Sequence, residues 1–143
     1  MVHLDAVHNI NISLVQQPLV AVFTGATSAI GEYIARALAK VHGKSGKGLR
    51  IYIVGRSQQK AEKNIADYRR ICPVGDFRFI KADLSLLREV DDACADIIAQ
   101  EAKETDGRID MLFMTQGEVR FGGRFGVSCF LKRNNITDHA RYR

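Results

Sequence analysis

The chain has 143 residues, of which 46% are apolar and 26% charged, with 12 glycines and two prolines. This composition is typical of one globular domain and excludes disordered, collagen-like and low-complexity classes. No apolar run approaches the roughly 18 residues that cross a bilayer, and the N-terminus does not resemble a secretion signal. Three cysteines without a C-x-x-C spacing fit reduced thiols, so we expect a soluble cytoplasmic protein with no membrane partner.

The net charge of +5 is unevenly distributed. Residues 118–143 hold six Lys or Arg against two acids, a net of +4, whereas residues 1–117 hold 15 basic and 14 acidic residues, a net of +1. A nucleic-acid partner would require basic residues on folded elements rather than on a short tail, so none is expected. The four histidines do not pair with cysteines or acids at ligand spacing, so no metal site is expected either.

The hydrophobic pattern divides the chain into three segments. Residues 1–18 lack a clean period and are predicted to form an N-terminal arm that packs loosely. Residues 19–117 are predicted to form the folded unit, and residues 118–143 an irregular basic tail. Within the folded unit the predicted elements, in chain order, are a strand at 19–24, a helix at 30–42, a strand at 49–54, a helix at about 58–71, a strand at 76–82, a helix starting near 85, and a strand at 109–114.

Three of the helices carry apolar stripes that predict their buried faces. The first stripe consists of Ile30, Ile34, Leu38 and Val41, and that of the second helix of Ala61, Ile65, Tyr68 and Cys72. The stripe of the last helix consists of Leu86, Leu87, Val90, Ala93, Cys94, Ile97 and Ile98. Strands joined by helices imply a parallel sheet covered on both faces, and right-handed crossovers give the strand order 3-2-1-4. The fold class is therefore predicted as α/β, the N-terminal half of a Rossmann-like sheet.

A glycine-bearing turn joins the first strand to the first helix. Its predicted cofactor-binding residues are Thr24, Gly25, Thr27, Ser28, Ala29, Ile30 and Gly31. Such a turn allows the backbone to approach a pyrophosphate, and the helix N-terminus beyond it offers free N–H groups. The alternative is a plain strand-to-helix turn. Its position after a buried strand, inside a strand–helix–strand unit, favours the phosphate site.

Three further pairs of residues follow the other strands. Arg56 and Ser57 stand where an acid would grip the ribose of NAD, and a guanidinium there suits the 2′-phosphate of NADP. The alternative for Arg56 is a solvated surface cation. Asp83, followed by Leu84, is expected either to accept a hydrogen bond from an adenine amino group or to cap the next helix. Gln116 and Gly117 are expected to approach a nicotinamide ribose, with a bland turn as the alternative.

Taken together, these motifs resemble the short-chain dehydrogenase/reductase family in order and spacing, over about residues 4–124. The amino-acid sequences of these segments are similar to those of a fungal subgroup associated with secondary-metabolite biosynthesis. The resemblance implies an oxidoreductase that uses NADP(H) and acts on a carbonyl or hydroxyl of a small-molecule substrate. The family pattern has glycine where Ala29 stands, and the methyl group there is expected to crowd the backbone nearest the phosphates.

The same family relies on a Tyr general acid/base with a Lys four residues later, and on a Ser that orients the carbonyl. No Tyr-x-x-x-Lys occurs in this sequence, so no catalytic residue is predicted. Loss of assisted proton transfer costs roughly two to four orders of magnitude in rate. The alternative function is therefore a truncated, catalytically inactive NADP-binding fragment whose basic tail is unrelated to the family.

Overall fold

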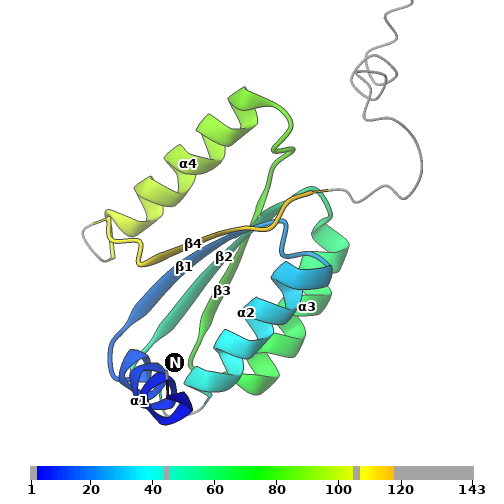
Figure 1. Ribbon diagram of the computed structural model, residues 1–143. Coiled ribbons are helices and arrows are strands. Elements are labelled where there is room, and N and C mark those ends of the chain that lie inside the picture. The colour runs from blue at the N-terminus through cyan, green and yellow to red at the C-terminus, as the bar shows by residue number, and fades with distance from the viewer. Residues whose placement is uncertain (1–2, 44–45, 105–106, 118–143) are drawn as a thin grey trace, which may run out of the picture.

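The computed structural model describes residues 3–43, 46–104 and 107–117 (Figure 1). The predicted basic tail, residues 118–143, lies outside the described residues. The elements are α1 (Leu4–Val15), β1 (Leu19–Thr24), α2 (Ala29–His42), β2 (Leu49–Gly55), α3 (Gln58–Ile71), β3 (Asp76–Lys81), α4 (Leu87–Glu101) and β4 (Met111–Met114). No helix in this part of the chain is long and apolar enough to cross a membrane.

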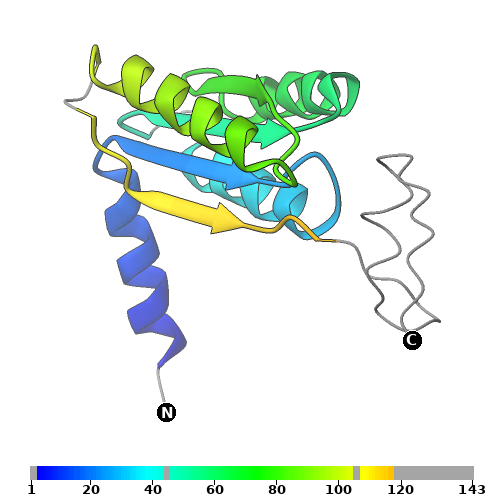
Figure 2. The ribbon, with the colours of Figure 1, turned by 90° about the horizontal axis from the view of Figure 1, so that it is seen from above.

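The four strands form one parallel sheet in the order β3-β2-β1-β4, as the sequence predicts. Helices α2 and α3 cover one face and α4 covers the other (Figures 1 and 2). Because side chains alternate along a strand, β1 supplies Ala21 and Phe23 to the α2/α3 core and Val20 and Val22 to the core under α4. This two-sided burial explains why β1 is apolar from Leu19 to Phe23.

The N-terminal arm contains a helix that the sequence pattern did not indicate. Residues 4–15 form α1, and its last carbonyl, that of Val15, accepts a hydrogen bond of 3.1 Å from the Lys47 amide. Leu4, Val7 and Ile10 are nevertheless exposed. Figure 2 shows α1 projecting away from the sheet beyond β4, so the arm is regular in structure.

The predicted buried face of α2 needs a correction. The residues of this helix that pack against the sheet are small or polar, namely Gly31, Ala35, Ala39 and His42. Ile30 and Val41 are exposed, while Ile34 and Leu38 are only partly buried. Small side chains allow α2 to lie close to the sheet. The bulkier residues of the predicted stripe therefore lie beside the helix–sheet contact rather than within it.

A similar correction applies to α4, which starts at Leu87 rather than near residue 85. Ala93 and Ile97 are buried, but Leu86, Leu87, Cys94 and Ile98 are exposed. The stripe predicted from the sequence is therefore wider than the surface that the four strands cover. β4 is also shorter than predicted, because Asp110 precedes it and accepts a 2.8 Å hydrogen bond from the Val20 amide.

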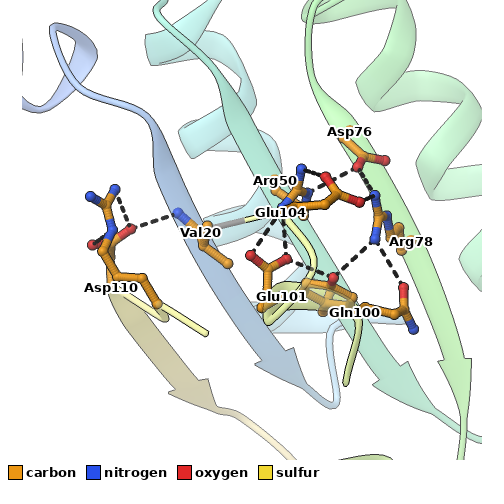
Figure 3. A network of polar contacts seen from close by, with 10 residues as sticks. Val20, Arg50, Asp76, Arg78, Gln100, Glu101, Glu104 and Asp110 are labelled. Atoms are coloured by element: carbon orange, nitrogen blue, oxygen red, sulfur yellow. Dashed lines mark hydrogen bonds and ion pairs between the residues drawn. The ribbon is translucent and has the colours of Figure 1, made fainter. Parts of the chain in front are cut away.

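An ion-pair network fixes the C-terminal end of α4 to the N-terminal ends of the strands (Figure 3). The fully buried carboxylate of Glu101 accepts hydrogen bonds of 2.8 and 2.9 Å from Arg50 and one of 2.7 Å from the Tyr52 hydroxyl. Arg78 of β3 donates to Gln100 and Glu104. Burial and the bond to Glu101 raise the pKa of Tyr52 to about 12. Nothing in the sequence pattern pointed to this network.

Candidate cofactor site

A cleft of about 280 Å³ lies at the carboxyl ends of the strands, where ligands bind in open α/β sheets. The residues that line it are Gly25, Val54, Gly55, Arg56, Ala82, Asp83, Leu84, Ser85, Gln116 and Gly117. Six of them are predicted site residues. They come from four separate turns, and the parallel strands bring these turns to one edge.

The β1–α2 turn approaches the end of β4 so closely that two positions exclude a side chain. Gly25 has φ of +84°, and a Cβ there would lie 2.6 Å from the amide nitrogen of Gln116. A Cβ on Gly31 would lie 2.8 Å from the Cα of Ala26 and would also collide with the hydroxyl of Thr115. These glycines therefore serve contacts within the protein, in addition to the backbone approach that the sequence motif predicts.

A set of hydrogen bonds ties the ends of β1 and β4 together. The Thr115 hydroxyl donates to the Thr24 carbonyl at 2.9 Å, and the Thr115 amide donates to the same oxygen at 2.9 Å. The Thr24 hydroxyl in turn contacts the side-chain oxygen of Gln116. Thr24 thus holds the Gln116 amide group at the rim of the cleft, a role that the sequence did not predict for it.

The remaining predicted residues of the turn surround the start of α2 rather than line the cleft. Ser28 is the N-cap residue, but its side chain makes no capping hydrogen bond. Ala29 has φ of +53°, in the left-handed region that glycine adopts without cost. Ile30 is exposed, and Thr27 lies against Gly55, where its methyl group would be 3.3 Å from an added Cβ.

Arg56 and Ser57 have different roles in the structure. Arg56 is exposed and lines the cleft directly after β2. The Ser57 hydroxyl is the N-cap of α3 and accepts a hydrogen bond from the Lys60 amide at 3.5 Å. This capping bond orders the residue next to Arg56, and it leaves the guanidinium as the cationic group of the cleft lining.

Asp83 and Leu84 line the cleft just after β3. One carboxylate oxygen of Asp83 accepts hydrogen bonds from the Ser85 hydroxyl at 2.8 Å and from the Ser85 amide at 3.2 Å. The Asp83 amide donates to Glu89, in the first turn of α4. Leu84 packs against the core under α4. Asp83 therefore orders the turn before α4, which starts four residues later.

Four residues of the lining were missed by sequence reasoning: Val54, Gly55, Ala82 and Ser85. Gly55, Ala82 and Ser85 each adjoin a predicted site residue, and Val54 lies two residues before Arg56. Ligands in open α/β sheets lie beyond the carboxyl ends of the strands. Applied to every residue at and just after the ends of β2 and β3, this rule predicts all four positions.

Comparison with known proteins identifies the family. The model of the short chain dehydrogenase family matches residues 19–127. The short-chain dehydrogenase/reductase SAT2 of Stachybotrys chartarum is 43% identical over 102 residues, which cover 68% of this chain and 29% of that protein. Oxidoreductase AN1596 of Emericella nidulans is 37% identical over 125 residues, 87% of this chain and 35% of that protein. The chain thus spans about a third of the length of these curated relatives.

Solved structures agree with the fold. An alcohol dehydrogenase from the archaeon Thermococcus sibiricus, complexed with 5-hydroxy-NADP, has a TM-score of 0.54 and 27% identity, covering 67% of this chain and 36% of that one. Actinorhodin polyketide ketoreductase with NADPH has a TM-score of 0.60 and 25% identity, covering 80% and 40%. The matched sequence, the parallel half-sheet and the glycine turn lead to one conclusion: this chain belongs to the short-chain dehydrogenase family.

Proposed function

We propose that the cleft binds NADP(H), with the pyrophosphate against the β1–α2 turn and the 2′-phosphate of the adenosine ribose against Arg56. The observation that carries this proposal is the exposed guanidinium of Arg56 in the cleft at the end of β2, where NAD-binding sites have an acid. A planar guanidinium binds phosphate oxygens through two parallel hydrogen bonds, whereas a carboxylate would repel them.

The turn fits a phosphate group for three reasons. Gly25 lines the cleft at the start of the turn, and Ser28 does not cap α2 with its side chain, so the first amides of the helix are free of that competitor. The helix dipole also favours an anion at this end. At the end of β3, the Asp83 carboxylate in the cleft lining is suited to accept a hydrogen bond from the adenine amino group. A bound nicotinamide cofactor supplies or accepts hydride.

A second part of the proposal concerns the reaction and whether this chain catalyses it. By family, the reaction is oxidation or reduction at a carbonyl or hydroxyl of a small molecule, and the names of the fungal relatives support oxidoreductase chemistry. The 143 residues contain no Tyr-x-x-x-Lys pair to donate a proton to the substrate oxygen. We therefore propose that this chain by itself binds the cofactor without measurable carbonyl reduction.

Fluorescence titration with NADPH and NADH tests both parts. Arg56→Asp should weaken NADPH binding at least about tenfold, because one charge-assisted hydrogen bond contributes about 1.5–3 kcal/mol, and should leave NADH binding nearly unchanged. Arg69→Asp makes the same charge change on an exposed site of α3 and serves as the matched control. Equal affinity of the unmodified chain for both cofactors would refute the role of Arg56. Carbonyl reduction by the purified chain would refute the proposed inactivity.

A further inference from the structure

A buried amide side chain, that of Asn64, lies between α3 and the β1–α2 turn. Asn64 is 8% exposed, and the other buried residues of α3 are Ala61, Ile65 and Tyr68. Asparagine is mostly found at protein surfaces, because a buried amide without hydrogen-bond partners costs stability. The partner of the Asn64 amide therefore indicates why this residue stands on the buried face of the helix.

The amide group of Asn64 bonds to the backbone of the β1–α2 turn. Its nitrogen donates to the carbonyl of Ala26 at 3.5 Å, and Ala26 itself is fully buried. One helical turn later on the same side of α3, the Tyr68 hydroxyl donates to the Glu32 carbonyl, in the first turn of α2. Helices α2 and α3 lie side by side on one face of the sheet (Figure 1). Helix α3 thus holds both the turn and the start of α2 by their backbone carbonyls.

The bond from Asn64 determines the direction of the next amide along the chain. Ala26 and Thr27 share one peptide unit, and this unit is trans, since the described chain contains no cis peptide bond. In a trans peptide the C=O and N–H groups point in opposite directions. Because the Ala26 carbonyl points toward α3, the Thr27 amide points away from α3. No backbone carbonyl within the described residues accepts a hydrogen bond from this amide, so it is available to a ligand.

Thr27 lies beside the turn that carries Arg56. Its methyl group would be 3.3 Å from a Cβ on Gly55, the last residue of β2, and Arg56 follows Gly55 directly. Thr27 is half-buried, and Arg56 is exposed. The Thr27 amide and the Arg56 guanidinium are therefore hydrogen-bond donors on two adjoining turns at the same edge of the sheet.

We propose that Asn64 is a positioning residue for NADP(H) specificity: by fixing the Ala26 carbonyl, it directs the Thr27 amide to the 2′-phosphate that Arg56 binds. This inference rests on the proposed function of the cleft. Hydrogen bonds to an ionised acceptor such as a phosphate are about twice as strong as those between neutral groups. NAD(H) has a neutral hydroxyl at the same position of the ribose, so it gains less from an amide held in this direction.

Fluorescence titration of Asn64→Leu with NADPH and NADH tests the positioning role. Leucine branches at the same carbon but has no donor, so the affinity for NADPH should fall about fivefold to tenfold, while that for NADH changes less than about twofold. Tyr52→Phe is the matched control. It also removes a buried side-chain hydrogen bond, the one to Glu101, but on the α4 side of the sheet and outside the cleft lining, so it should leave both affinities unchanged. Circular dichroism checks that both variants are folded.

Nuclear magnetic resonance of the unmodified chain tests the Thr27 contact without any variant. Adenosine 2′-monophosphate should shift the Thr27 amide proton downfield, because a phosphate oxygen accepts its hydrogen bond. Adenosine lacks the phosphate and should not produce this shift. In Asn64→Leu the same titration with adenosine 2′-monophosphate should give a smaller shift.

The outcomes separate this inference from the proposed function. A preference for NADPH together with an unshifted Thr27 amide overturns the role of Asn64 and leaves the cofactor site standing. The same conclusion follows if Asn64→Leu weakens NADPH and NADH binding equally, as a purely structural residue would, or if it changes neither affinity. If the unmodified chain binds neither cofactor, or both equally, the proposed function fails and this inference fails with it.

Discussion

Replacing Ala29 with glycine should stabilise the protein, which is the reverse of the usual effect at the start of a helix. Ala29 has φ of +53°. An L-residue in this region costs roughly 1–2 kcal/mol because its Cβ crowds the following carbonyl oxygen, and glycine has no such cost. Glycine loses roughly 0.5–1 kcal/mol more backbone entropy on folding. The difference leaves Ala29→Gly more stable by about 1 kcal/mol.

Urea denaturation followed by circular dichroism measures this difference in the free energy of unfolding. Ala37→Gly is the matched control, because Ala37 is also an exposed alanine of α2 but does not have a positive φ. That variant should lose about 1 kcal/mol, the helix-interior cost of glycine. The reasoning fails if Ala29→Gly and Ala37→Gly destabilise the protein alike.

Three more predictions concern residues away from that strained position. Glu101→Ala should lower the free energy of unfolding by about 3 kcal/mol, because it removes the fully buried carboxylate to which Arg50 and the Tyr52 hydroxyl donate, whereas Glu104→Ala, at the exposed rim, should cost less than about 1 kcal/mol in the same urea titration. Burial lowers the pKa of His42 from 6.5, so the folded state binds fewer protons than the unfolded state, and stability should fall below pH 6.5 by up to about 1.4 kcal/mol per pH unit. His42→Leu should flatten that acid limb, and an unchanged limb would assign it to other groups. Gly25→Ala should reduce both stability and NADPH affinity, since its Cβ meets the Gln116 backbone; unchanged thermal unfolding would contradict the close approach.

The sequence was sufficient for the elements whose burial is local and periodic. β1 is apolar from Leu19 to Phe23 because both of its faces are covered there, and α3 follows its predicted stripe from Ala61 to Tyr68. Crossover handedness then determined the strand order. The arm is different: Leu4, Val7 and Ile10 of α1 are exposed rather than aligned on a buried face, and the helix has no clean apolar stripe, so hydrophobic periodicity gave no signal for it.

The network around Glu101 was beyond sequence reasoning for another reason. Its partners Arg50 and Tyr52 are 51 and 49 residues away in the chain, and a single Glu at the end of a helix looks like any solvated acid. The apolar stripes of α2 and α4 were predicted to be buried against the sheet, but several of their residues are exposed in the structure. A stripe shows only that a surface avoids water. It does not show whether the sheet or a further layer covers that surface.

The two ends of the sheet are built from different chemistry, which makes the cleft more sensitive to backbone geometry than to most side-chain changes. At the N-terminal ends, ion pairs between side chains hold α4 in place. At the carboxyl ends, the β1–α2 turn is held by backbone contacts that leave no space for a Cβ at Gly25 and Gly31. Between these glycines the path of the chain is determined, so Ala29 has to accept a left-handed φ whatever its own preference. The strain at Ala29 is thus a consequence of how closely the turn approaches β4, and the same close approach shapes the side of the cleft where we propose that the pyrophosphate binds.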